Sequence, residues 1–169
     1  MAIISNSISS AIASAAVTSP IMVFKRSLAR NGGFGFDRSP GVAAAFWREC
    51  VIDGNIVAQW LANVGRKDAR GRLAHLLCEM AVRSNQIGRY VGGRFPLPVT
   101  QEQIADALGL TSVHVNRTMQ SLRGEGLVHT SNREVIVLDW QGLIRAGEFD
   151  ASYLHLPPTS AVSRQASAG

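Results

Sequence analysis

The sequence predicts a mostly α-helical protein with a small β component, in which a long dimerisation helix is followed by a winged helix-turn-helix domain. A long stretch with two apolar stripes (41–65) predicts the first helix. A capped helix, a glycine turn and a second helix (100–126) predict the helix-turn-helix, and two β-branched runs after it predict the wing. The chain has 169 residues, 46% of them hydrophobic, which suits one domain or two small ones.

Composition narrows the class of protein further. No apolar run approaches the ~18 residues that a membrane helix needs, so we expect no membrane partner. The two cysteines, Cys50 and Cys78, are too few for a disulfide scaffold or a four-thiolate metal site within one chain. These features indicate a cytoplasmic, mostly helical protein.

The first forty residues show no core of their own. Residues 1–20 are rich in Ser and Ala and resemble a signal peptide, but they lack the positive charge of one and serines interrupt the apolar run. An exported protein cleaved near Ala15 is therefore the alternative to an intracellular one. Residues 21–24 suit a short strand, and residues 31–35 suit a glycine-rich loop.

The segment 41–65 predicts a helix that is apolar on two faces. One stripe has heptad-like spacing, and a second stripe of Trp47, Val51, Ala58 and Leu61 lies beside it. A small chain covers one such face, so a second copy of the helix is expected to cover the other; the alternative is an ordinary monomer core. The predicted dimer interface is Phe46, Cys50, Val57, Trp60 and Val64.

Asp68 is a suitable N-cap for the next helix, expected over about 69–86 with Gly88 beyond its end. The following segment, 90–99, predicts a short irregular β-hairpin. Its two prolines, Pro96 and Pro98, limit it to edge pairing.

The helix-turn-helix prediction rests on local signals. Thr100 followed by Gln103 is a capping box, so a helix begins there. Gly109 ends that helix, and Thr111 or Ser112 caps the next one. Ala105 is small where the two helices are expected to cross. An unrelated helical hairpin is the alternative.

The second helix of this motif is expected to divide into an inward and an outward face. Val115, Met119 and Leu122 share the inward face. The outward face carries no acid, which is unusual for a face that is merely solvated. Arg, Asn and Gln side chains hydrogen-bond base edges, and an aliphatic side chain contacts the thymine methyl group. The outward residues are Val113, Arg117, Gln120 and Gly124, flanked by His114, Asn116 and Ser121.

Two strand-like runs, 127–130 and 135–138, follow this helix and predict the wing, with Arg133 at its tip. Asp139 is expected to cap a last short helix near 141–145. The tail from Pro157 onward is rich in Pro, Ser and Ala and is expected to be disordered.

Charge is concentrated in one segment. The net charge is +5, and the segment 66–94 holds seven basic residues against the two acids Asp68 and Glu79. Arg pairs well with phosphate, so this segment is expected to supply phosphate contacts, although a solvated basic face is the plainer alternative. The basic residues are Arg66, Lys67, Arg70, Arg72, Arg83, Arg89 and Arg94.

From about 42 to about 156 the sequence resembles the Crp/Fnr family of bacterial transcription regulators. The strongest motif runs from Thr100 to Thr111 (TQEQIADALGLT) and continues through 115–117 and 126–128. Asp68 resembles the hinge aspartate of the family. The resemblance implies base contacts at Ser112, Val113, Asn116 and Arg117 and phosphate contacts at Thr100 and Gln101. With the face analysis, the candidate DNA-binding residues are Thr100, Gln101, Ser112, Val113, His114, Asn116, Arg117 and Gln120.

The expected organisation follows from the resemblance. Residues 1–40 are a remnant of an effector barrel or a disordered arm, 41–65 the dimerisation helix, 66–142 the Crp-type winged helix-turn-helix domain, and 143–169 an extension with a disordered tail. The implied function is sequence-specific transcription regulation by a homodimer on a palindromic double-stranded operator, with RNA polymerase as a further expected partner.

The sequence departs from the family pattern in two ways. Many members carry Glu where this chain has Val113, so a different DNA sequence preference is expected. The effector-binding β-barrel of the family is much larger than the segment before the dimerisation helix. The chain also lacks a counterpart of the nucleotide cradle and of the cysteine cluster, so no cofactor is expected.

No catalytic constellation stands out, so an enzyme is not expected. His75 and Cys78 lie three apart on one predicted helix without a third ligand nearby, and a packed helix face is the favoured interpretation over a metal site. The main alternative function is a shortened interaction protein that forms mixed dimers with full-length relatives and modulates them.

Overall fold

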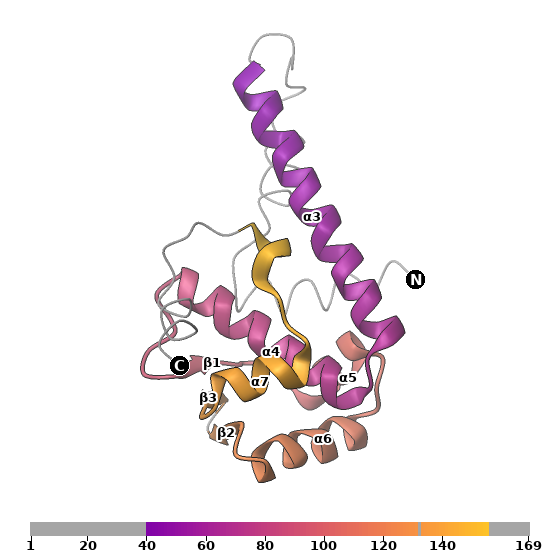
Figure 1. Ribbon diagram of the computed structural model, residues 1–169, viewed down its shortest axis with the longest axis vertical. Coiled ribbons are helices and arrows are strands. Elements are labelled where there is room, and N and C mark those ends of the chain that lie inside the picture. The colour runs from indigo at the N-terminus through magenta and orange to yellow at the C-terminus, as the bar shows by residue number, and fades with distance from the viewer. Residues whose placement is uncertain (1–39, 132, 156–169) are drawn as a thin grey trace.

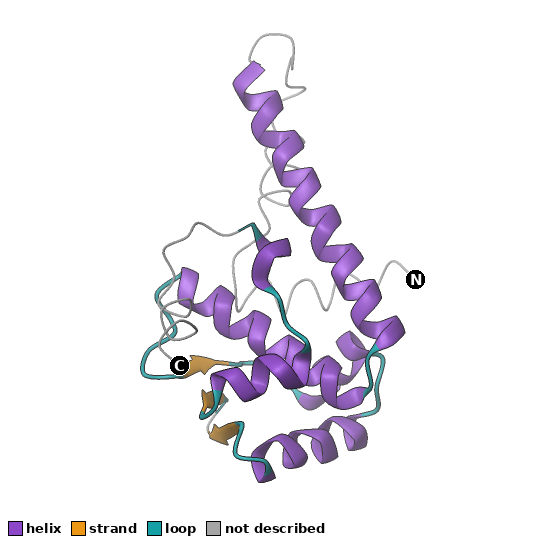
Figure 2. Cartoon of the chain, viewed as in Figure 1, coloured by secondary structure: helices purple, strands orange, loops and turns teal. Residues whose placement is uncertain are grey.

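A long helix projects from a compact bundle that carries a small sheet (Figure 1). The computed structural model describes residues 40–131 and 133–155. Helices dominate, and the strands lie together at one side (Figure 2). In chain order the elements are α3 (Pro40–Arg66), α4 (Ala69–Gln86), β1 (Arg94–Pro96), α5 (Gln101–Leu108), α6 (Ser112–Gly124), β2 (Val128–Ser131), β3 (Glu134–Val137), α7 (Trp140–Gly147) and the 3-10 helix η2 (Ala151–Leu154).

Helix α3 is 27 residues long and has two different sides. Ile56 and Trp60 pack against the core, and Asn63 on the same side is fully buried. The opposite side exposes large apolar side chains to solvent. We call this set the α3 stripe: Trp47, Val51, Val57 and Leu61.

The structure divides the residues predicted for the dimer interface. Trp60 does not face outward but packs on its own domain, where its ring meets the His75 ring edge-on at 6.2 Å. Val57 is 67% exposed, whereas Phe46, Cys50 and Val64 are half-buried. The reason is that the predicted apolar stripe runs along the border between the core side and the solvent side of α3. Some of its residues therefore pack inward and others stay exposed.

Helix α4 is the centre of the core. Asp68 caps it as predicted, and its carboxylate accepts a 2.7 Å hydrogen bond from the Gly71 amide. Leu73 and Leu77 are fully buried because α6, α7 and β1 all pack around this helix. A buried helix of this kind supplies most of the apolar area that stabilises a small domain.

The sheet has the order β1-β3-β2, and both pairings are antiparallel. The β2–β3 hairpin after α6 is the predicted wing. The segment 90–99 was expected to form a hairpin by itself, and this expectation is only partly correct: Val91 and Arg94 form one bridge, while β1 pairs with β3 of the wing. Pro96 lies on an edge strand, as predicted, because proline has no amide hydrogen to donate.

Helix α7 closes the core against α4. Asp139 caps it as predicted and accepts from the Gly142 amide at 2.8 Å. The last residue of α7, Gly147, comes so close to α4 that an added Cβ would lie 2.7 Å from the backbone nitrogen of His75. A side chain at this position would therefore separate the two helices. The predictions for 1–39 and for the tail from 156 lie outside the described residues.

The burial of Asn63 leads to a prediction about the free energy of unfolding. It is fully buried, and neither its amide nitrogen nor its amide oxygen has a hydrogen-bond partner. Leaving buried polar atoms unpaired costs about 1–3 kcal/mol, so Asn63→Leu is expected to raise the free energy of unfolding by that order. Urea denaturation followed by circular dichroism measures it. Unchanged or lower stability, with the native spectrum retained, would contradict this account of Asn63.

Candidate nucleic-acid interface

Helix α5 begins with the predicted capping box. The Thr100 hydroxyl accepts from the Gln103 amide at 3.2 Å, and the Gln103 side chain accepts from the Thr100 amide at 2.9 Å. The reciprocal bonds satisfy two amides that the first turn leaves open. Gln101, the first residue of α5, is thereby placed at the exposed edge of the motif.

The turn between α5 and α6 depends on Gly109. Its φ of 64° lies in the left-handed region, which glycine adopts without steric cost. The Leu110 amide then donates to the Ala105 carbonyl at 2.9 Å, and Ala105 is buried where the helices pack. Arg72 of α4 donates to the Leu108 carbonyl at 3.1 Å and so caps the end of α5.

Helix α6 is held by its inward face. Thr111 is its N-cap and accepts from the His114 amide at 3.3 Å. Val115 and Leu122 are buried as predicted, and Met119 packs at the edge of the core. Thr118 is also buried, which the sequence did not indicate. This packing fixes the rotation of α6 and so decides which side chains face outward.

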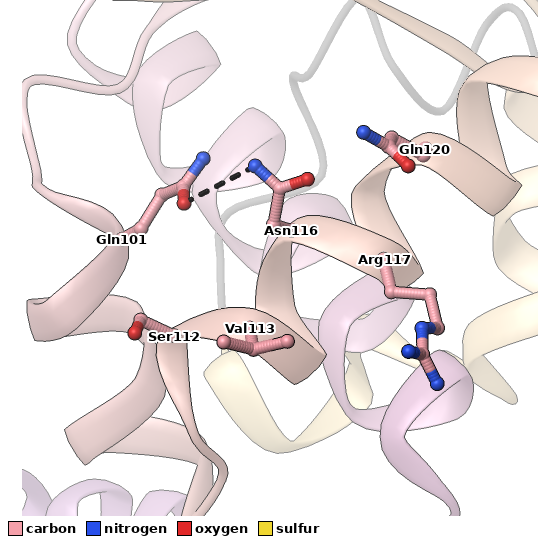
Figure 3. A pocket seen from close by; sticks show the side chains of 6 residues that line it. All are labelled: Gln101, Ser112, Val113, Asn116, Arg117 and Gln120. Atoms are coloured by element: carbon pink, nitrogen blue, oxygen red, sulfur yellow. Dashed lines mark hydrogen bonds between the residues drawn. The ribbon is translucent and has the colours of Figure 1, made fainter.

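The outward face of α6 and the first residue of α5 form one hollow of about 370 Å³ (Figure 3). The hollow contains no acidic side chain. Six of the eight predicted DNA-binding residues line it, whereas Thr100 and His114 do not. The lining residues are Gln101, Ser112, Val113, Asn116, Arg117 and Gln120.

Side chains in the hollow differ in how they are held. The Asn116 amide donates to the Gln101 side-chain oxygen at 3.4 Å, a long hydrogen bond that joins α5 to α6. Arg117 extends away from this pair (Figure 3), and Val113 is 67% exposed. The hollow thus presents a guanidinium, amide groups and an aliphatic surface to whatever occupies it.

An ion pair anchors the C-terminal end of α6. Glu125, the residue after α6, receives two hydrogen bonds from Arg70 of α4 and one of 2.9 Å from Ser121. The hydrogen bond from Arg70 is the main cause that lowers the pKa of Glu125, and the same bond raises the pKa of Arg70. Arg70 and Glu125 lie 55 residues apart, so no local sequence signal marks the pair.

The expectation that the basic segment 66–94 supplies phosphate contacts stays a prediction, but part of the charge of this segment is paired within the chain. Four of its seven basic side chains have partners within the chain. Their partners lie in distant elements, on the same helix or in the connection before it, so these side chains contribute to the stability of the fold. Arg70 binds Glu125, Arg72 binds the Lys67 and Leu108 carbonyls, Arg83 binds Glu79, and Lys67 binds the Gly147 and Glu148 carbonyls.

Arg133 lies at the turn of the wing, as predicted. It is exposed and has a φ of 63°, and its carbonyl accepts from the Leu97 amide at 2.7 Å. This backbone bond ties the wing to the segment after β1.

Comparison with known proteins identifies the family to which this architecture corresponds. A Crp-like helix-turn-helix domain model matches residues 71–146, which include α4 to α7 apart from the first residues of α4 and the last of α7. The chain belongs to the Crp/Fnr family.

Two relatives of this Crp/Fnr-family chain are named as an activator and a regulation protein. The transcriptional activator protein FnrL of Cereibacter sphaeroides is 36% identical over 118 residues, which are 68% of this chain and 48% of that protein. The nitrogen fixation regulation protein FixK of Azorhizobium caulinodans is 31% identical over 107 residues, 63% of this chain and 43% of that protein. The chain thus spans about half the length of these relatives.

Among solved structures, FixK2 from Bradyrhizobium japonicum superposes with a TM-score of 0.58 and 26% identity. The superposition covers 69% of this chain and 59% of that one. In the part of this Crp/Fnr-family chain that the structure describes, no helix combines the length and apolar character needed to cross a bilayer.

Proposed function

We propose that this chain is a DNA-binding transcription regulator that acts as a homodimer, with α6 in the major groove of a palindromic operator. The observation that carries the proposal is the acid-free outward face of α6, where Arg117, Asn116 and Gln120 line one hollow with exposed Val113. The matching Crp-like helix-turn-helix model and the relatives, among them a transcriptional activator, support it.

The chemistry of the hollow matches the edges of bases in the major groove. Arg117 supplies a planar fork that suits the O6 and N7 acceptors of guanine. Asn116 and Gln120 supply amides, which suit adenine. Val113 offers an aliphatic surface to the thymine methyl group, where an acidic side chain would instead favour cytosine. Arg133 on the wing suits a backbone phosphate.

The α3 stripe supports the dimer. Its side chains lie on the face of α3 opposite the buried Asn63, and three of the four are at least two-thirds exposed: Trp47 and Val57 at 67% each and Leu61 at 74%. Apolar patches of this kind on a long helix favour pairing with a second helix. Pairing two copies through α3 would present two α6 helices, and we infer that they enter successive major grooves about 34 Å apart.

A direct binding experiment tests the proposal. Fluorescence anisotropy of a random-sequence duplex pool, titrated with the full chain, is expected to show binding that weakens with salt. The slope of log affinity against log salt is expected to be about −0.9 for each phosphate neutralised. Selection from the pool is expected to recover a palindromic duplex. A chain that binds no duplex at low ionic strength would exclude this function.

The exposed α3 stripe also supports a second candidate, an interaction protein that forms mixed dimers with longer family members and modulates them. Native mass spectrometry of this chain mixed with a longer relative distinguishes the two. Mixed dimers that form in preference to homodimers, together with no duplex binding by this chain alone, would favour the second candidate.

A further inference from the structure

The residues after α7 lie between the long helix and the core. We call residues 148–155 the strap; they include η2, and the Crp-like domain model ends before them at residue 146. Figure 1 shows η2 beside the lower half of α3 and near α4. Phe149 and Leu154 are buried, so the strap is packed and not an exposed extension.

The strap is the principal neighbour of α3. Among the described elements, η2 contacts α3 more extensively than α4 does. Asn55 of α3 and His155 of the strap are joined by a side-chain hydrogen bond of 2.9 Å. The long helix therefore depends on the strap for much of its contact with its own domain.

Lys67 ties the start of the strap to the junction between α3 and α4. It lies in the two-residue connection between these helices and donates to the carbonyls of Gly147 and Glu148. Its ammonium group also lies 3.1 Å from His75 Nδ1. Burial is the main cause that lowers the pKa of Lys67.

From His75 the hydrogen bonds continue through the strap into α4. His75 Nε2 lies 3.2 Å from the Tyr153 hydroxyl, which donates to Glu79 Oε2 at 2.7 Å. Arg83 donates to the other oxygen of Glu79 at 2.8 Å. His75 and Glu79 are almost completely buried, and Tyr153 stacks on the His75 ring.

This chain of hydrogen bonds has one consistent direction when His75 is neutral. Nδ1 then accepts from Lys67, and Nε2–H donates to the Tyr153 oxygen. The groups facing His75 are Lys67 from the helix junction, Glu79 from α4 and Tyr153 from the strap. Burial, followed by the charge of Lys67, lowers the pKa of His75. Burial, followed by the Glu79 charge, raises the pKa of Tyr153.

We propose that the strap fixes the angle between α3 and the helix-turn-helix domain, with Tyr153 and Lys67 as positioning residues for DNA binding. The inference rests on the proposed function, because the angle matters when two domains must reach two half-sites together. A fixed angle sets one separation between the two α6 helices. Binding of both half-sites is strong only where the DNA spacing matches that separation.

The test compares spacings on DNA. The probe is the palindromic duplex that the native chain recovers from a random pool, and a second duplex carries two extra base pairs between half-sites, which moves them about 7 Å farther apart. We call the dissociation constant for the longer duplex divided by that for the recovered duplex the spacing ratio. This ratio is expected to be about tenfold smaller in Tyr153→Phe than in the native chain, a change of the size of coupling energies within a packed network. A duplex with a single half-site is expected to bind Tyr153→Phe and the native chain equally.

Tyr90→Phe is the matched control. It removes the other tyrosine hydroxyl of the chain, from a half-buried ring stacked on Phe95. Its spacing ratio is expected to equal that of the native chain. A Tyr153→Phe ratio equal to the native ratio would overturn the inference. Equal losses on the half-site and the palindrome would also overturn it, because they indicate a merely structural role.

A measurement without DNA gives a second readout. A nitroxide on Glu102→Cys in a Cys50→Ser background reports the distance between the α5 helices of two protomers. The remaining cysteine, Cys78, is not expected to take the label, because it is fully buried and burial raises the pKa of its thiol. The distance distribution is expected to be narrow in this labelled parent chain and broad when it also carries Lys67→Met or Tyr153→Phe. Equally narrow distributions would overturn the inference. A labelled parent chain without an intermolecular distance, together with a native chain that is monomeric in analytical ultracentrifugation, would instead overturn the homodimer.

Discussion

Replacing Leu61 by Glu is expected to convert the protein from a dimer into a monomer and to weaken binding to a palindromic duplex about a hundredfold or more. Leu61 is 74% exposed in the centre of the C-terminal half of α3, on the side away from the core. Pairing would bury the new carboxylate without a partner, which costs several kcal/mol. The monomer retains its fold because Leu61 contributes little to its own core.

Analytical ultracentrifugation at micromolar concentration measures whether the chain is a dimer or a monomer. Fluorescence anisotropy measures its affinity for the palindromic duplex. Gln59→Glu is the matched control, because it introduces the same charge two residues away on the side of α3 that lies off the α3 stripe. That variant is expected to dimerise. A Leu61→Glu chain that dimerises like the native one would place the interface elsewhere.

Arg117→Ala is expected to cost about 1–3 kcal/mol on the selected duplex and to relax selectivity at one base pair. The guanidinium lines the hollow, extends from the exposed face of α6, and is turned away from the Gln101–Asn116 pair (Figure 3). A fork that donates two bonds to one guanine distinguishes that base from the other three. Its removal therefore affects the specific site more than random DNA.

Arg117→Lys separates charge from geometry. It keeps the positive charge but loses the planar fork, so the salt dependence is expected to persist while selectivity at that base pair falls. Binding constants for the four base substitutions at each position of the selected duplex provide the measurement. An equal loss of affinity on selected and random duplexes in Arg117→Ala would contradict base recognition and indicate a phosphate contact.

Local signals in the sequence predicted the helix-turn-helix well. The capping box of Thr100, the left-handed Gly109 and the Thr111 cap each depend on residues within one helical turn. Such interactions need no distant part of the chain, because their partners are adjacent backbone groups. The inward positions of Val115 and Leu122 followed from helical periodicity alone.

The basic segment shows where prediction from sequence stops. Its charge was visible, but its partners were not: Arg72 binds a carbonyl 36 residues away, and Lys67 binds one 80 residues away. No periodicity or cap marks contacts over such separations. The strap was missed for the same reason, since Tyr153 gains a role only when it lies against His75 and Glu79.

The amino-acid sequence by itself determined where the helices begin and end and which face of α6 carries the polar side chains, because caps and periodicity act over a few residues. It also determined that α3 is apolar on more than one face. Only the tertiary structure decided which face packs inward: Trp60 meets His75, while Val57 and Leu61 stay in solvent. The physical reason is that burial depends on which distant surface is present to pack against, and that surface exists only after the chain has folded.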